Sequence, residues 1–181
     1  FDFSMKILYS MIPAILVGLL LESHIEMLFI DNLNLVGYML IVTAILLILA
    51  DKKQNNNKNL SKKHSIIIGI AQAIAIIPGI SRSGATISIS VLLGITKEQA
   101  ARFSFLMVVP LIFGKMIQDI FFGEVIYDTN LTPLLFGFIF AFITGFFACK
   151  WMIKLVQKSQ LKYFSLYCTL IGGIIILYSF Y

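Results

Sequence analysis

Two apolar runs of the chain, residues 65–77 and 87–95, are joined by the polar stretch Pro78-Gly79-Ile80-Ser81-Arg82-Ser83-Gly84-Ala85-Thr86. Proline ends an incoming helix because it lacks an N–H group, and the two glycines allow a tight turn. The serines and the threonine are residue types that cap a helix where it restarts. The free N–H groups of a restarting helix, together with the guanidinium of Arg82, predict a binding site for phosphate.

The composition predicts an integral membrane protein. Of the 181 residues, 59% are hydrophobic and only 13% are charged, and the mean hydropathy is +0.94. A soluble globule of this size cannot bury that much apolar surface. The net charge of +5 is interpreted by how the charged residues divide between the two sides of a bilayer, because that division sets the topology. Because aromatic residues do not alternate with the basic ones, we expect no nucleic-acid partner. Cys149 and Cys168 lie in apolar runs and are expected to pack as ordinary core residues.

Five apolar runs are long enough to cross roughly 30 Å of hydrocarbon as helices, so the predicted fold is all-α. They are residues 5–21, 33–50, 99–122, 131–151 and 161–181. The remaining apolar segment, residues 65–95, has two limbs that are too short to span the bilayer twice, because each crossing needs about 20 residues. We therefore expect this segment to be a re-entrant helix hairpin within a helical bundle.

The distribution of charge supports the same topology. If residues 65–95 enter and leave on one face, nearly all the basic residues fall on that face, as expected for a cytoplasmic side. They are Lys6, the lysines of residues 52–63, Lys97, Arg102, Lys150, Lys154, Lys158 and Lys162. The acidic residues Glu22, Glu26, Asp31, Asp119, Glu124 and Asp128 then fall on the other face. Irregular backbone at membrane depth must be covered by protein or line a water-filled cavity, so residues 79–83 are expected to line a polar cavity.

A weak internal repeat adds to this topology. Ala14-x-x-x-Gly18 aligns with Ala141-x-x-x-Gly145, and the linkers that follow are acidic in the first case and basic in the second. A reversed charge is expected of an inverted-topology repeat. We therefore describe residues 1–181 as a single membrane domain. Residues 1–63 hold the last two transmembrane helices of the first repeat and a basic loop, and residues 64–181 hold the hairpin 65–95 and three transmembrane helices. By symmetry, a hairpin and a helix are expected before Phe1.

Several motifs resemble those of the bacitracin-resistance family of undecaprenyl-diphosphate phosphatases. They are Gly69-x-x-Gln72, the stretch 78–87, Phe103-Ser104-Phe105-Leu106 and Pro110. The resemblance implies a phosphatase that hydrolyses undecaprenyl diphosphate to undecaprenyl phosphate and phosphate, recycles the lipid carrier for cell-wall synthesis and gives bacitracin resistance. It also implies a multi-pass protein of the bacterial plasma membrane, an inverted repeat and a polyprenyl diphosphate lipid as partner. A homodimer is left as an open alternative.

One family signature is absent from this chain. The family carries an E/Q-x-x-x-E motif followed by a serine-rich Ser-Gly-His stretch, and no such stretch occurs here. We read Glu22-x-x-x-Glu26 as an interfacial acidic loop and His24 as an interfacial residue. The resemblance implies a divalent cation, Mg²⁺ or Ca²⁺, whose ligands we expect before Phe1, and we assign no metal ligand within residues 1–181. This chain alone is accordingly expected to be inactive.

The candidate site residues come from the central motif and from the segment before it. We assign Arg82, Ser81 and Ser83 as catalytic, and Gly79, Arg82, Ser83, Gly84, Thr86 and Gln72 as phosphate-binding. Other roles remain open: a carboxylate partner for Arg82, helix capping for the hydroxyl residues, and an interhelical contact for Gln72. Lys115 is expected to pair with Asp119, four residues further on, rather than with a substrate.

Two other functions are consistent with the sequence. Broken helices in an inverted repeat are typical of secondary transporters, so translocation of a lipid phosphate or another anion is one alternative. A non-catalytic fragment that binds phosphate is the other. Release of phosphate by the purified protein distinguishes the phosphatase from both.

Overall fold

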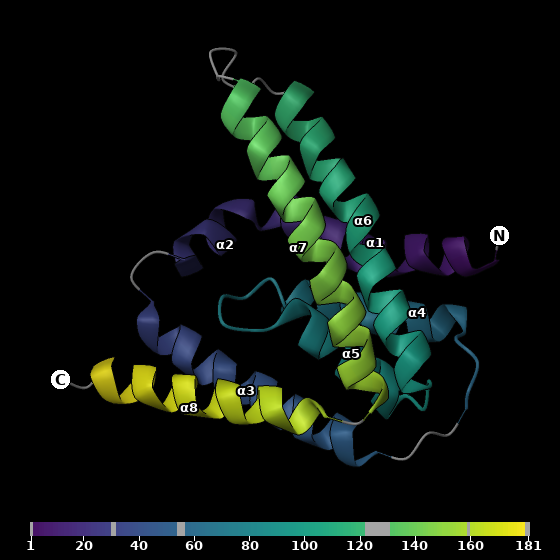
Figure 1. The fold of residues 1–181 in the computed structure, drawn as a ribbon, viewed down its shortest axis with the longest axis vertical. Coiled ribbons are helices and arrows are strands. Elements are labelled where there is room, and N and C mark those ends of the chain that lie inside the picture. Colours follow the sequence, from purple (N-terminus) through teal and green to yellow (C-terminus); the bar gives the residue numbers. More distant parts are fainter. Residues whose placement is uncertain (1, 30–31, 54–56, 122–130, 159, 180–181) are drawn as a thin grey trace.

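The computed structural model describes residues 2–29, 32–53, 57–121, 131–158 and 160–179, and the regular structure of these residues is helical (Figure 1). The helices are α1 Asp2–Leu20, α2 Glu22–Phe29, α3 Leu33–Lys52, α4 Lys62–Ile74, α5 Arg82–Leu92, α6 Lys97–Phe121, α7 Leu131–Gln157 and α8 Leu161–Ser179. Five of these helices, α1, α3, α6, α7 and α8, are long and apolar enough to cross a membrane. The prediction of an all-α integral membrane protein is confirmed. The acidic residues Asp31, Glu124 and Asp128 lie outside the described residues.

The acidic segment after α1 is helical, so its interpretation as a loop is wrong. It forms α2, which is separated from α1 by Leu21 alone. Leu21, Ile25 and Leu28 recur at helical spacing and line an apolar groove against α1 and α4. The helical spacing of these apolar residues is typical of an amphipathic helix, so a segment with two carboxylates can still be helical.

Helices α3 and α8 pack side by side in opposite directions (Figure 1). The Ser165 hydroxyl donates to the Ala44 carbonyl oxygen at 2.9 Å, and near one end the Leu161 N–H donates to Asp51 Oδ1 at 3.2 Å. Near the other end, a Cβ built on Gly172 would lie 2.9 Å from the Gly37 carbonyl oxygen. The two backbones approach this closely only because both positions are glycine.

Helices α4 and α5 are the limbs of the hairpin, and residues 75–81 form its turn. The two open ends of the hairpin lie together, because the Lys58 N–H donates to the Gly94 carbonyl oxygen at 3.0 Å. Ser61 caps α4 by accepting from the His64 N–H at 3.2 Å. The predicted helix–turn–helix is therefore confirmed, and its depth in a bilayer stays a prediction.

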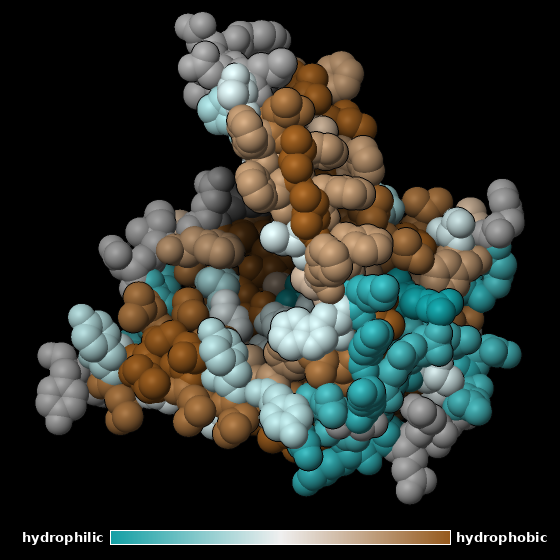
Figure 2. Space-filling model, in the orientation of Figure 1, coloured by the Kyte–Doolittle hydropathy of each residue, from teal (hydrophilic) through white to brown (hydrophobic). Residues whose placement is uncertain are grey.

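The chain ends of several helices that carry basic residues meet at one end of the molecule. The Lys97 ammonium donates to the Asp51 carbonyl oxygen at 3.1 Å, which joins the start of α6 to the end of α3. The Lys62 ammonium lies 5.6 Å from the centre of the Tyr9 ring. Hydrophilic residues gather at this end, at the lower right of Figure 2, while apolar residues cover the projecting helices α6 and α7. This grouping agrees with the predicted sidedness.

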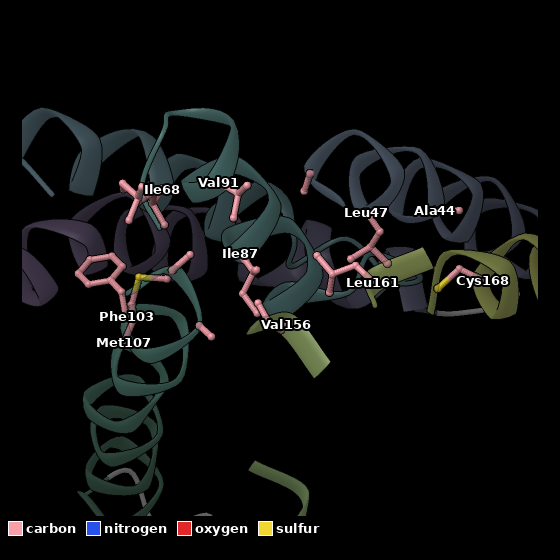
Figure 3. Packing of buried hydrophobic residues seen from close by; sticks show 14 residues of the cluster. Ala44, Leu47, Ile68, Ile87, Val91, Phe103, Met107, Val156, Leu161 and Cys168 are labelled. Atoms are coloured by element: carbon pink, nitrogen blue, oxygen red, sulfur yellow. The ribbon is translucent and has the colours of Figure 1, made fainter. Parts of the chain in front are cut away.

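A buried apolar cluster joins the hairpin to its neighbours (Figure 3). Ile68 of α4 and Ile87 of α5 are fully buried, as are Phe103 and Met107 of α6. Val156, near the end of α7, packs in the same cluster, whereas residues 132–151 of that helix are exposed. The hairpin is therefore held by packing on several helices, while most of α7 offers its side chains to lipid.

Candidate functional site

The turn between α4 and α5 is anchored on the middle of α3 by one threonine. Thr43 Oγ1 accepts from the Ser81 N–H at 3.1 Å and donates to the Met39 carbonyl oxygen at 3.0 Å. The Gly79 carbonyl oxygen lies 3.5 Å from the same hydroxyl, and Thr43 is fully buried. Thr43 was not among the residues predicted from the sequence. The one sequence signal for it is a hydroxyl residue within the apolar run 39–50.

The two glycines of the motif are explained by packing. Gly79 has a φ of +92°, and a Cβ at this position would lie 2.5 Å from the Val36 carbonyl oxygen. A Cβ on Gly84 would lie 3.0 Å from Ser81 Oγ. Glycine at 79 therefore lets the turn lie against α3, and glycine at 84 leaves room for the cap of α5. Phosphate contacts by these two residues stay predictions.

Ser81 caps α5, as one of its two predicted roles requires. Its Oγ accepts from the Gly84 N–H at 3.1 Å, and its carbonyl oxygen accepts from the Ala85 N–H at 2.8 Å. Within the described residues, no acceptor is found for the N–H groups of Arg82 and Ser83. The start of α5 therefore offers two N–H donors beside the half-buried side chains of these same residues. Catalytic roles for Ser81 and Ser83 stay predictions.

Thr86 is held inside the protein rather than at a cavity. It is fully buried, and its Oγ1 lies 2.7 Å from the hydroxyl of Ser104 on α6. Thr86 Oγ1 also donates to the Arg82 carbonyl oxygen at 2.9 Å. This arrangement joins α5 to α6 and does not support the predicted contact of Thr86 with phosphate.

A cavity of about 660 Å³ lies between α1, α6 and the ends of α4 and α5 that face the turn. Among the predicted site residues, it brings together Gln72 and Arg82. Ser81, Ser83, Gly79, Gly84 and Thr86 are not among its lining residues. The lining residues are Met11, Ala14, Ile15, Gly18, Leu19, Gln72, Ala75, Ile76, Arg82, Pro110, Leu111, Ile112, Gly114, Lys115 and Gln118. Lys115 and Gln118 are lining residues that the sequence analysis did not assign to the site.

Gln72 is buried without a partner. Its side chain is 1% exposed, and neither Nε2 nor Oε1 has a hydrogen-bond partner among the described residues. A buried amide without partners costs free energy, which a ligand can recover by hydrogen bonding. The position of Gln72 depends on Gly69, where a Cβ would collide with the Ser10 carbonyl oxygen of α1. The close approach of α1 and α4 therefore places the amide at the cavity.

The ionisable residues that line the described part of the cavity are basic. The Arg82 guanidinium makes no hydrogen bond or ion pair with any residue that the structure describes. Pairing of Arg82 with a carboxylate from the segment expected before Phe1 stays an open alternative. Arg82 and Lys115 both line the cavity, and its described lining includes no Asp or Glu. A guanidinium, an ammonium, a buried amide and the start of a helix are groups that suit a phosphate anion. The predicted pairing of Lys115 with Asp119 involves a side chain outside the described part.

Comparison with known proteins finds similarity to one family. Residues 1–174 match the model of the family described as bacitracin resistance protein BacA. A protein of Christiangramia forsetii named undecaprenyl-diphosphatase is 54% identical over 180 residues, which are 99% of this chain and 68% of that protein. A Bacteroides fragilis protein of the same name is 45% identical over 96% of this chain and 67% of its own length. A third, from Methanobrevibacter smithii, is 40% identical over 93% of this chain and 62% of its length.

Proposed function

Because the chain belongs to the BacA family of bacitracin resistance proteins, we propose that the intact protein hydrolyses undecaprenyl diphosphate to undecaprenyl phosphate and inorganic phosphate. The reaction would recycle the lipid carrier of cell-wall synthesis and so give resistance to bacitracin. The protein would act as a multi-pass protein of the bacterial plasma membrane. A homodimer stays a prediction.

One observation carries the proposal at the level of the site: Arg82 and the unpartnered amide of Gln72 line the same cavity. The guanidinium is planar and can bind two phosphate oxygens at once, which a lysine cannot do. The two N–H groups at the start of α5 add donors, and the positive end of the helix favours the anion. Together these groups would hold the terminal phosphate of the substrate.

The reaction needs the same groups. The oxygen of a water molecule attacks the terminal phosphorus, and the bond from that phosphorus to the bridging oxygen breaks. The bridging oxygen keeps the electron pair and leaves with the lipid phosphate, and the inorganic phosphate that forms keeps the protons of the water or releases one to solvent. Negative charge spreads over the phosphoryl oxygens in the transition state, and donors already in place stabilise it without reorganising. Arg82 would supply most of this stabilisation.

The divalent cation that the family resemblance implies does not fit the residues described here. No group of three or more His, Cys, Asp or Glu occurs among them. The polar residues of the cavity, which include Arg82 and Lys115, suit an anion and would repel a cation. We therefore assign no step of the reaction to a metal held by these residues.

Phosphate release by the intact protein in detergent tests the proposal. Wild-type protein should release phosphate from a soluble short-chain prenyl diphosphate, and Arg82→Ala should lower kcat/KM by about a hundredfold, as loss of an oxyanion donor does. Lys150→Ala, at an exposed position of α7, serves as the control. A wild-type protein that moves the labelled lipid across vesicles without releasing phosphate would support the transporter instead.

A further inference from the structure

Lys115 is the feature of the cavity that the proposed function leaves unused. It lies on α6, in a candidate membrane span whose residues are mostly apolar. A charge within an apolar span is costly, and such residues mark sites of function. Lys115 lines the same cavity as Arg82.

The face of α6 that carries Lys115 points to the cavity along its length. Leu111, Gly114, Lys115 and Gln118 line the cavity, and their spacing places them on one side of a helix. A Cβ built on Gly114 would meet nothing within 4 Å, so there is open space beside Lys115. The lysine and the glutamine, one turn apart, give this face two groups that can donate to an anion.

The polar side chains that line the cavity differ in how deeply they are buried. Gln72 is 1% exposed at the hairpin, Arg82 is half-buried, and Lys115 is exposed. A head group that enters this cavity would bring its terminal phosphate to the buried end, beside Gln72 and Arg82. The phosphate attached to the lipid would follow, nearer to the open end and Lys115. Apart from Gln118, the remaining lining, such as Ile15 and Leu19 of α1, is apolar, as the first isoprene units require.

We propose that Lys115 binds the lipid-linked phosphate of the substrate, while Arg82 binds the terminal one. This inference rests on the proposed function. A diphosphate offers more phosphate oxygens than one guanidinium can bind, and an ammonium that lines the same cavity is a donor suited to the second phosphate. When the bond between the two phosphates breaks, the bridging oxygen takes the electron pair, so charge grows on the group that Lys115 faces.

The test compares Lys115→Gln with Lys150→Gln, which removes an exposed lysine of α7. In the intact protein, Lys115→Gln should lower kcat/KM for a short-chain prenyl diphosphate by about tenfold, the effect of losing one charged hydrogen bond. Inhibition by the prenyl monophosphate product should weaken by a similar factor. Inhibition by inorganic phosphate should not change, because inorganic phosphate binds at Arg82. Lys115→Arg should restore most of the loss.

The inference is overturned if Lys115→Gln matches Lys150→Gln in both kcat/KM and product inhibition. It is also overturned if inhibition by inorganic phosphate weakens as much as inhibition by the lipid product. If Lys115→Gln melts at a lower temperature than wild type, Lys115→Met, which keeps an unbranched apolar side chain, replaces it. If the wild-type protein releases no phosphate, the proposed function fails, and calorimetric binding of the prenyl monophosphate to wild type and Lys115→Gln still decides the role of Lys115.

Discussion

Replacement of Thr43 by valine should weaken the site without opening a hole in the core. Valine keeps the branched shape of threonine but removes Oγ1, which accepts from the Ser81 N–H at 3.1 Å. That N–H then has no partner in the part-buried space between α3 and the turn, which costs about 1–3 kcal/mol. The lost donation to the Met39 carbonyl oxygen adds little, because that oxygen already belongs to the helix ladder. A penalty of about 2 kcal/mol corresponds to about thirtyfold in an equilibrium constant.

The penalty falls on the turn that precedes Arg82, so it should appear in catalysis as well as in stability. We expect Thr43→Val to lower kcat for phosphate release by up to about thirtyfold and to weaken inhibition by inorganic phosphate. Thr43→Ser keeps the hydroxyl and is the matched control, with most of the activity retained. Thr43→Val should also melt a few degrees below Thr43→Ser in detergent, because the lost hydrogen bond lowers the free energy of unfolding. Equal activity of Thr43→Val and Thr43→Ser would refute the idea that this hydrogen bond positions Arg82.

Three further predictions concern the contact of Arg82 with phosphate, the packing of α3 on α8 and the membrane topology. Arg82→Lys should keep the charge but lose the two-oxygen contact, so its kcat/KM should fall between those of wild type and Arg82→Ala. Activity equal to wild type would contradict the binding of two phosphate oxygens by Arg82. Gly172→Ala should lower the melting temperature, because its Cβ would lie 2.9 Å from a carbonyl oxygen of α3, whereas Gly173→Ala, with nothing within 4 Å, should raise it slightly; the reverse order would contradict the observed packing. Cysteines placed at the exposed positions Lys58 and Glu98 should both react with a membrane-impermeant reagent from the cytoplasmic face, and labelling from opposite faces would rule out a re-entrant hairpin.

The helices follow from local sequence patterns more fully than the site does. The apolar runs predict α1, α3, α6 and α8 to within three residues, because a bilayer sets a minimum length for an apolar helix. Helix α7 continues six residues beyond its predicted run, to Gln157. The hairpin follows from Pro78 and from the shortness of its limbs. Helix α2 was missed because its charges received more weight than the spacing of Ile25 and Leu28. The inverted repeat stays a prediction, although the antiparallel packing of α3 on α8 agrees with it.

The site was predicted only in part, since two of its features depend on contacts between distant segments. Arg82 and Gln72 belong to recognisable motifs, and both line the cavity. Thr43 could not be assigned, because its role arises only when α3 packs against a turn 38 residues later. Lys115 could not be assigned to the cavity from the sequence, because its place there depends on which face of α6 meets α1. Thr86 belongs to the motif, yet it lies one turn into α5, where Ser104 covers its hydroxyl.

The hairpin is fastened at both its base and its tip, by the Lys58 to Gly94 hydrogen bond and by Thr43. Its backbone therefore loses its conformational entropy when the protein folds, before any substrate arrives. A loop that had to become ordered around each incoming phosphate would subtract that entropy from the binding free energy in every catalytic cycle. Here the pinned tip presents Arg82 and the start of α5 in one arrangement, so the free energy of binding the head group remains available for the transition state.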